Sequence, residues 1–153
     1  MATADACGEV GLQIPQFSDE TKKKLAEEIP GATRTNPTDI DLGFSATLKE
    51  KDPFGVRARI IEGDENVDML AIVGLGEYNP KAPMEMALEV QETCKKPFII
   101  VWPSAGKEVD ECKEILQQKK VPLFSTPERG ARALGTLMRY KKGVARLTRE
   151  GVQ

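Results

Sequence analysis

Three short apolar runs constrain the fold of this chain more than any other feature. They are residues 69–73 (MLAIV), 97–102 (PFIIVW) and 121–125 (VPLFS), and none alternates polar with apolar side chains. An uninterrupted apolar run of this length is typical of a strand that is buried on both faces. The segments between the runs have apolar residues at helical spacing. Strands that alternate with helices predict βαβ units, right-handed crossovers and a parallel sheet.

Capping residues predict where the helices begin and end. A helix over residues 1–12 is expected to stop at Gly11, because glycine readily adopts the left-handed conformation that ends a helix. Ser18 and Asp52 precede helical patterns and are predicted N-caps. Thr126 and the proline after it are expected to open the last helix.

These elements together predict an α/β fold: a flavodoxin-like, doubly wound parallel sheet in three α/β/α layers. We expect the domain to span residues 1–142, with 143–153 as a C-terminal tail or linker. In a 2-1-3-4-5 sheet the first strand is central, between a predicted strand at 32–35 and the run at 69–73. The given sequence starts at the helix that follows such a strand. We therefore expect that the two neighbours pair directly, that another chain supplies the strand, or that the isolated protein is poorly stable.

Composition excludes several classes of function. The chain has no histidine, so by itself it cannot perform serine–histidine catalysis or carry a phosphohistidine. Its net charge of −2 lacks the basic excess that nucleic acids or anionic membranes require. Cys7, Cys94 and Cys112 are widely spaced, which favours reduced thiols in the cytoplasm over disulfides or a zinc site. No run approaches the roughly 20 apolar residues of a membrane span, and the start lacks a signal-peptide pattern.

The loop after the run at 69–73 is the first candidate ligand site, because ligands of open α/β folds bind beyond the carboxyl ends of the strands. Gly74 and Gly76, on either side of Leu75, would let the backbone approach a ligand closely. The amino end of the next helix would face an anion there. This GLG sequence lacks the third glycine of a dinucleotide-binding motif, and an ordinary strand-to-helix turn explains it equally well.

The loop after the run at 97–102 is the second candidate. Ser104, Gly106 and Lys107 could complement an anionic group at the start of the following helix. The SAGK sequence is not the eight-residue P-loop pattern, so an ordinary turn is again the alternative.

The segment NPTDID, residues 36–41, is the third candidate. Asp39 and Asp41 could bind a cation or hold a loop. Asn36 and Pro37 are turn-forming residues, which favours a structural role for the segment. We predict no metal site and no catalytic residue in this chain.

Five segments, taken in order, resemble a known family. They are ATADACGEVGLQIPQFSDETKKKL, NPTDID, VDMLAIVG, KKPFIIVW and VPLFSTPERGARALGTLMRY, which extend from Ala2 to Tyr140. Their order and spacing are similar to the C-terminal flavodoxin-like, succinyl-CoA synthetase-like domain of the NDP-forming acyl-CoA synthetases. That family includes the ADP-forming acetate–CoA ligases. In the family the domain begins with a strand and a glycine loop, which this sequence does not include.

The resemblance implies a role in a modular enzyme. Such an enzyme converts an acid, CoA and ATP to acyl-CoA, ADP and phosphate through a phosphohistidine and an acyl phosphate. Its CoA-binding and ATP-grasp domains would be the partners of this chain, and the phosphorylated histidine lies on a different domain. CoA, ATP or ADP and Mg would bind to the full enzyme and not to this chain alone.

The resemblance also assigns a local role to this chain. Gly74, Leu75 and Gly76 would form backbone of a pocket for a small carboxylic acid or acyl phosphate. The chain would contribute substrate-pocket and interface surface and be inactive by itself. A non-catalytic small-molecule-binding or assembly module of the same fold is the alternative hypothesis.

Overall fold

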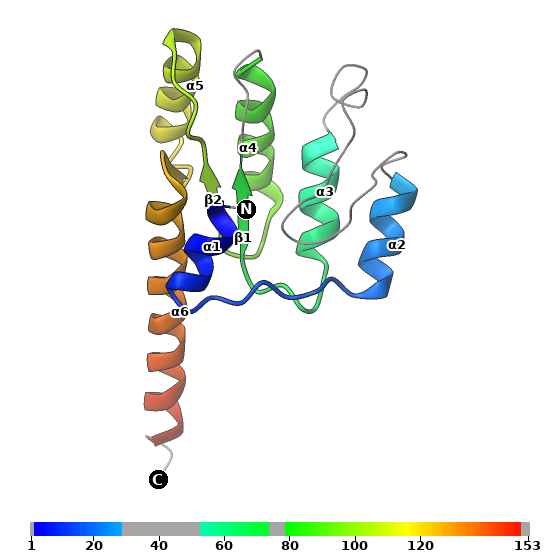
Figure 1. The fold of residues 1–153 in the computed structure, drawn as a ribbon, viewed down its shortest axis with the longest axis vertical. Helices are drawn as coiled ribbons and strands as arrows, with labels where there is room; N and C mark the ends of the chain where they lie inside the picture. The colour runs from blue at the N-terminus through cyan, green and yellow to red at the C-terminus, as the bar shows by residue number, and fades with distance from the viewer. Residues whose placement is uncertain (1, 29–52, 74–78, 151–153) are drawn as a thin grey trace.

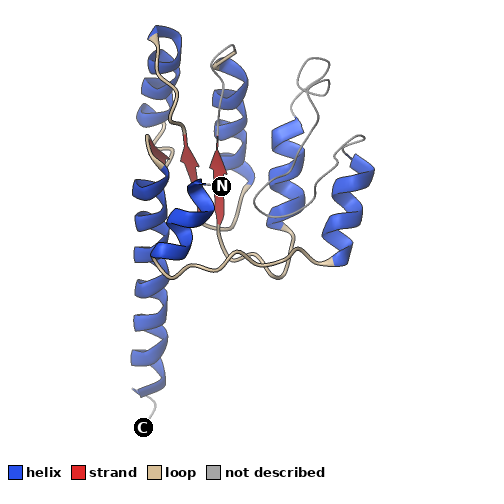
Figure 2. Ribbon diagram, viewed as in Figure 1, coloured by secondary structure: helices blue, strands red, loops and turns tan. Residues whose placement is uncertain are grey.

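In a computed structural model of the chain, a parallel sheet lies between two layers of helices (Figures 1 and 2). The structure describes residues 2–28, 53–73 and 79–150. The strands in this part of the chain are β1 (Leu70–Val73), β2 (Phe98–Val101) and β3 (Leu123–Phe124), in the order β1-β2-β3. The helices are α1 (Ala2–Glu9), α2 (Asp19–Glu28), α3 (Pro53–Glu62), α4 (Lys81–Thr93), α5 (Lys107–Gln118) and α6 (Pro127–Glu150).

All three apolar runs form strands, and each is followed by a helix, so the flavodoxin-like α/β fold is confirmed. The strands are parallel, and in their register Leu70 of β1 lies opposite Phe98 of β2, while Ile100 of β2 lies opposite Leu123 of β3. The predicted strand at 32–35 and the predicted N-cap Asp52 lie outside the described residues.

The two faces of β2 are covered by different helices, as expected for strands buried on both sides. Ile99 and Val101 pack with Leu134 of α6 on one face. Ile100 packs against α4 and α5 on the other, in a cluster that includes Leu116. Because successive side chains of a strand point to opposite faces, one short apolar run contributes to both halves of the core.

Small residues let α6 lie close to the sheet and to α1. A Cβ atom added at Gly130 would lie 2.7 Å from Ile99 Cδ1 and 3.0 Å from Val101 Cγ2. One added at Gly135 would lie 3.0 Å from Val10 Cγ2, just beyond α1. Glycine at these positions therefore sets how closely α6 packs against its neighbours.

The capping predictions at α1, α2 and α6 are confirmed. Gly11 has φ of 80°, and the amide of Leu12 donates to the carbonyl of Cys7 at 3.0 Å, which is the glycine-ended helix stop expected from sequence. The amide of Thr21 donates to Ser18 Oγ at 3.2 Å. Helix α6 begins at Pro127 and continues to Glu150, so much of the predicted tail is helical, and the boundary at residue 142 stays a prediction.

β1 is the outermost of the described strands. The amide of Leu70 donates to Pro97 O at 2.9 Å, toward β2. Along a strand, the backbone amides of successive residues point to opposite neighbouring strands. The amides of Ala71 and Val73 therefore point away from β2. Val73 is 39% exposed. The sequence-based expectation about a missing central strand concerns this edge, and it stays a prediction.

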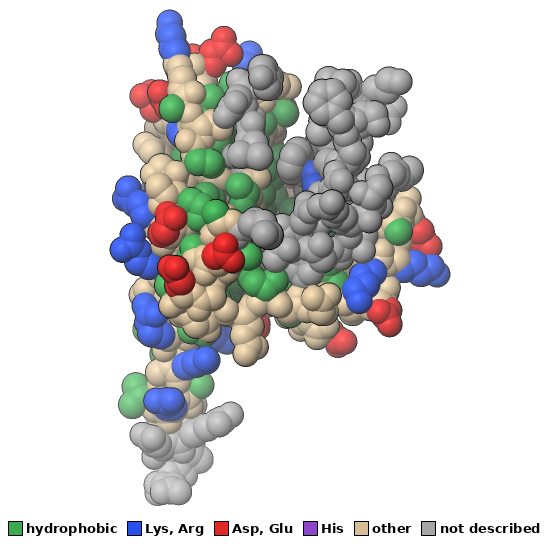
Figure 3. All heavy atoms as spheres, in the orientation of Figure 1, with side chains coloured by type: hydrophobic (Ala, Val, Ile, Leu, Met, Phe, Trp, Pro, Cys, Tyr) green, Lys and Arg blue, Asp and Glu red, His purple; other side chains and the backbone are tan. Residues whose placement is uncertain are grey.

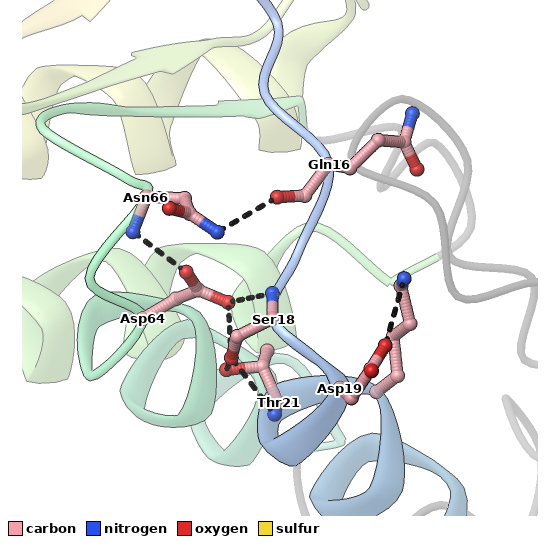
Figure 4. A network of polar contacts seen from close by, with 7 residues as sticks. Gln16, Ser18, Asp19, Thr21, Asp64 and Asn66 are labelled. Atoms are coloured by element: carbon pink, nitrogen blue, oxygen red, sulfur yellow. Dashed lines mark hydrogen bonds and ion pairs between the residues drawn. The ribbon is translucent and has the colours of Figure 1, made fainter.

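A buried carboxylate, which the sequence analysis did not single out, joins α2 to the loop before β1 (Figure 4). Asp64 is 1% exposed. Its Oδ2 accepts from the amide of Ser18 at 2.8 Å and from the Ser18 hydroxyl at 3.1 Å, and its Oδ1 accepts from the amide of Asn66 at 2.8 Å. The last of these is a local Asx turn, which the sequence GDEN could have indicated. Asp64 precedes β1, at the end of the sheet opposite the candidate ligand loops.

None of the helices in the described ranges is both long and apolar enough to cross a membrane.

Candidate functional site

The candidate site lies where β2 and β3 end and the chain turns into α5 and α6. Of the predicted site residues, Ser104, Gly106 and Lys107 are described. The loops of Gly74, Leu75 and Gly76 and of Asn36, Pro37 and Asp39 lie outside the described residues, and their roles stay predictions.

Ser104 faces inward, against α5. It is 7% exposed, and its carbonyl oxygen accepts a hydrogen bond from the Lys113 ammonium group. No hydrogen-bond partner of its hydroxyl lies among the described residues. Ser104 therefore fixes the loop to α5 through its backbone, and its side chain points away from solvent.

Gly106 and Lys107 lie at the exposed start of α5. Gly106 has φ of 136°, a backbone conformation that side chains rarely adopt, so the turn requires glycine. Its carbonyl accepts the amide of Asp110 at 2.8 Å and thereby starts the helix. The structure thus brings Gly106 and Lys107 together on the surface and separates them from the inward-facing Ser104.

The charge at this helix end limits what it can bind. The first turn of α5 contains Glu108 and Asp110 beside Lys107, and these carboxylates already complement the positive end of the helix dipole. A multiply charged phosphate would meet both carboxylates there. The described loop therefore offers one lysine to an anion, with two carboxylates close by in the same helix turn.

A pocket of about 200 Å³ opens beside the inward side of this loop. It lies between α5, the carboxyl ends of β2 and β3, and the first turn of α6. Its lining residues are Trp102, Lys113, Gln117, Leu123, Phe124, Ser125 and Arg129. Trp102 ends the second apolar run, whereas Lys113 and Arg129, the two basic side chains of the pocket, were not predicted from the sequence. The sequence signal for Arg129 was its position four residues after the third apolar run, at the same edge of the sheet as the other loops.

The cysteines do not provide a nucleophile for this site. Burial raises the pKa of the Cys112 thiol, which packs in the core on the inner face of α5. Burial likewise raises the pKa of the thiols of Cys7 and Cys94. Since the thiolate is the reactive form, all three are poorly suited to covalent catalysis at neutral pH. Within the ranges that the structure describes, no cluster of three or more histidine, cysteine or acidic residues could hold a metal ion.

Comparison with known proteins connects this geometry to a family. Over 140 residues, or 91% of the chain, the sequence is 32% identical to the ADP-forming acetate–CoA ligase I of Archaeoglobus fulgidus. The chain matches one part of the ADP-forming acetate–CoA ligase family. It is also 28% identical, over 93% of its length, to the subunit alpha of the ADP-forming acetate–CoA ligase II of Pyrococcus furiosus.

The match covers only part of each ligase. The chain spans 19% of the Archaeoglobus ligase and 31% of the Pyrococcus subunit. The crystal structure of PH0766 from Pyrococcus horikoshii OT3 has the same fold, with a TM-score of 0.75 over 94% of this chain and 33% of that one, at 23% identity. No protein-family model matches the sequence. The resemblance to the acetate–CoA ligases is thus confirmed for this domain, while the activity of the whole ligases belongs to their full length.

Proposed function

We propose that this chain acts as a domain or subunit of an ADP-forming acyl-CoA synthetase and is inactive alone. The observation that supports the proposal is the match of 91% of the chain, at 32% identity, to one-fifth of an ADP-forming acetate–CoA ligase. A domain that corresponds to so small a share of an enzyme depends on the remainder for most of the chemistry.

The proposed reaction converts an acid, CoA and ATP to acyl-CoA, ADP and phosphate. The phosphoryl group would pass through a phosphohistidine and an acyl phosphate before CoA displaces phosphate from the acyl group. Because this chain has no histidine, the phosphorylated residue must belong to a partner domain. The resemblance to the acetate–CoA ligases likewise assigns CoA, ATP or ADP and Mg to the CoA-binding and ATP-grasp domains.

The proposed contribution of this chain is substrate-pocket backbone and interface surface. Gly74, Leu75 and Gly76 would approach the small carboxylic acid or acyl phosphate, and Lys107 would attract its negative charge. The three free cysteines and the ligase homology favour the cytoplasm as the site of action.

A chimeric enzyme tests the proposal. Residues 2–140 would replace the matched segment of the Archaeoglobus ligase, and ATP formation from acetyl-CoA, ADP and phosphate would be measured. We expect activity from the chimera and none from this chain alone. A chimera without activity, although it folds and still phosphorylates its histidine on addition of ATP, would contradict the proposal.

Paired lysine variants of the chimera test the local role. Lys107→Ala is expected to raise the KM for acetate, while Lys119→Ala, which is also exposed and caps the other end of α5, should leave it unchanged. Calorimetry with acetate, acetyl phosphate, CoA and ADP addresses the alternative hypothesis of a binding module. Tight binding of one of these ligands by this chain alone, without activity in the chimera, would favour that alternative.

A further inference from the structure

The second half of α6 extends beyond the sheet and the other helices (Figure 1). It carries a line of exposed hydrophobic side chains, which we call the α6 seam: Leu137, Tyr140, Val144 and Leu147, with exposed fractions of 40%, 70%, 43% and 72%. These are four of the seven large hydrophobic side chains that are exposed in the described part of the chain. Such a concentration on one helix marks an interaction surface.

The spacing of the seam is that of a coiled coil. Its residues follow one another at intervals of three, four and three positions. This spacing gives a narrow stripe, suited to one partner helix, and not the broad apolar face of a helix that lies on a membrane. Gly143 and Ala145 beside the seam keep it narrow.

A hollow of about 440 Å³ lies at the end of the seam that is nearest the sheet. Leu137 belongs to both the seam and the wall of the hollow, which Phe98, Phe124 and Leu134 also line. Lys95 and Lys96 complete one side. An apolar hollow that continues a seam can accept an anchoring side chain of a bound helix.

The charge around the seam indicates the partner. Between Leu137 and Thr148 the helix carries Arg139, Lys141, Lys142 and Arg146 and no acidic residue. Figure 3 shows basic and hydrophobic side chains together on the projecting part of the molecule. Lys141 lies 3.7 Å from Asp68, but both side chains are more than 80% exposed, so this pair is weak and exchangeable. Two copies of this surface would repel each other, whereas an acidic helix would be attracted.

We infer that the α6 seam and its hollow bind an acidic amphipathic helix of a partner protein. The bound helix has apolar residues at three- and four-residue spacing and Asp or Glu beside them. This inference rests on the surface of α6 and not on the proposed ligase activity, so either can fail without the other.

Peptide binding tests the inference. The probe is a fluorescent 21-residue helical peptide with leucine at the seam-facing positions and glutamate at the flanking ones. A matched peptide has lysine in place of each glutamate. The test variant carries two substitutions in the seam, Tyr140→Ser and Leu147→Ser. The control variant is Ile115→Ser, which removes a hydrophobic side chain that is 40% exposed from α5, away from the seam.

We expect the glutamate peptide to bind the full chain more tightly than the lysine peptide, and more weakly as salt is added. The double variant should lose at least about tenfold in affinity, which is about 1.4 kcal/mol, while Ile115→Ser binds like the wild type. Equal binding of both peptides, no binding of either, or no effect of the double variant would overturn the inference. So would a wild-type dimer in sedimentation that the double variant dissociates, or binding to phosphatidylserine vesicles without binding to the glutamate peptide.

Discussion

Asp64 shows how one buried carboxylate can hold two elements together. It gathers hydrogen bonds from Ser18 at the start of α2 and from Asn66 before β1. Asp64→Asn would place an amide group where these donors converge, so we expect the free energy of unfolding to fall by about 1–3 kcal/mol. Urea unfolding measures the loss. Asp68→Asn is the control, because its side chain is 83% exposed, and an equal loss in both variants would contradict the prediction.

The same residue predicts a pH dependence of stability. Burial raises the pKa of the Asp64 carboxyl, but the hydrogen bonds from Thr21, Asn66 and Ser18 outweigh it and hold the pKa below its ordinary value. A carboxyl whose pKa is lower in the folded state stabilises the fold above its unfolded pKa of about 3.9, and this contribution is lost as pH falls through the folded value. The stability difference between wild type and Asp64→Asn should therefore be constant near neutral pH and shrink below about pH 4. A difference that grows on acidification would be inconsistent with this sign.

Two glycines of α6 have opposite roles and make a matched pair. Alanine at Gly143 meets no atom within 4 Å, so Gly143→Ala should stabilise the helix by about 0.5–1 kcal/mol. Gly130→Ala gains the same helix propensity but must displace Ile99 and Val101. We expect it to be less stable than Gly143→Ala by about 1–3 kcal/mol. Thermal or urea unfolding of the two variants, measured in parallel, gives this difference. Equal stabilities would contradict the close packing of Gly130 against the sheet.

At the scale of elements, α1 depends on α6 for its position. Ala6 and Cys7 pack against Ala131, and Val10 lies against Gly135. Gly135→Val should push α1 outward and make the Cys7 thiol react with a thiol reagent about tenfold or more faster, because opening exposes a buried group. Cys112, buried on the far side of the sheet, is the internal control. Faster reaction of both thiols would indicate global destabilisation and not undocking of α1.

The sequence predicted the elements well because their signals are local. Uninterrupted apolar runs and capping residues such as Gly11 and Ser18 act over a few positions, and each of these gave the correct strand or helix end. The Asp64 network was missed because it joins residues 46 positions apart, and no periodicity reports such a contact. The inward direction of Ser104 was missed for a similar reason, since its burial depends on how the loop packs against α5, where Lys113 bonds to the Ser104 carbonyl.

At the scale of the whole molecule, the two proposed binding surfaces lie at opposite ends of the sheet. The candidate ligand loop follows the carboxyl ends of the strands, whereas the hollow beside the α6 seam is lined by residues that precede β2 and β3. A partner helix on the seam would therefore leave the ligand loop accessible. The sequence predicted the first surface from the rule for α/β folds, but the second required the exposure of α6 in the folded chain.

The last prediction concerns the outer edge of β1. The amides of Ala71 and Val73 point away from β2, whereas those of Ile99 and Val101 lie inside the sheet. In the isolated chain we expect the amides of Ala71 and Val73 to exchange hydrogen at least about a hundredfold faster than those of Ile99 and Val101. An unpaired edge strand can open without disrupting the core. Placing the chain in the chimeric ligase should slow exchange at these two amides if a partner strand binds there. Strong protection at Ala71 and Val73 in a monomer would instead show that the edge is already paired, and the isolated domain would then have a complete sheet of its own.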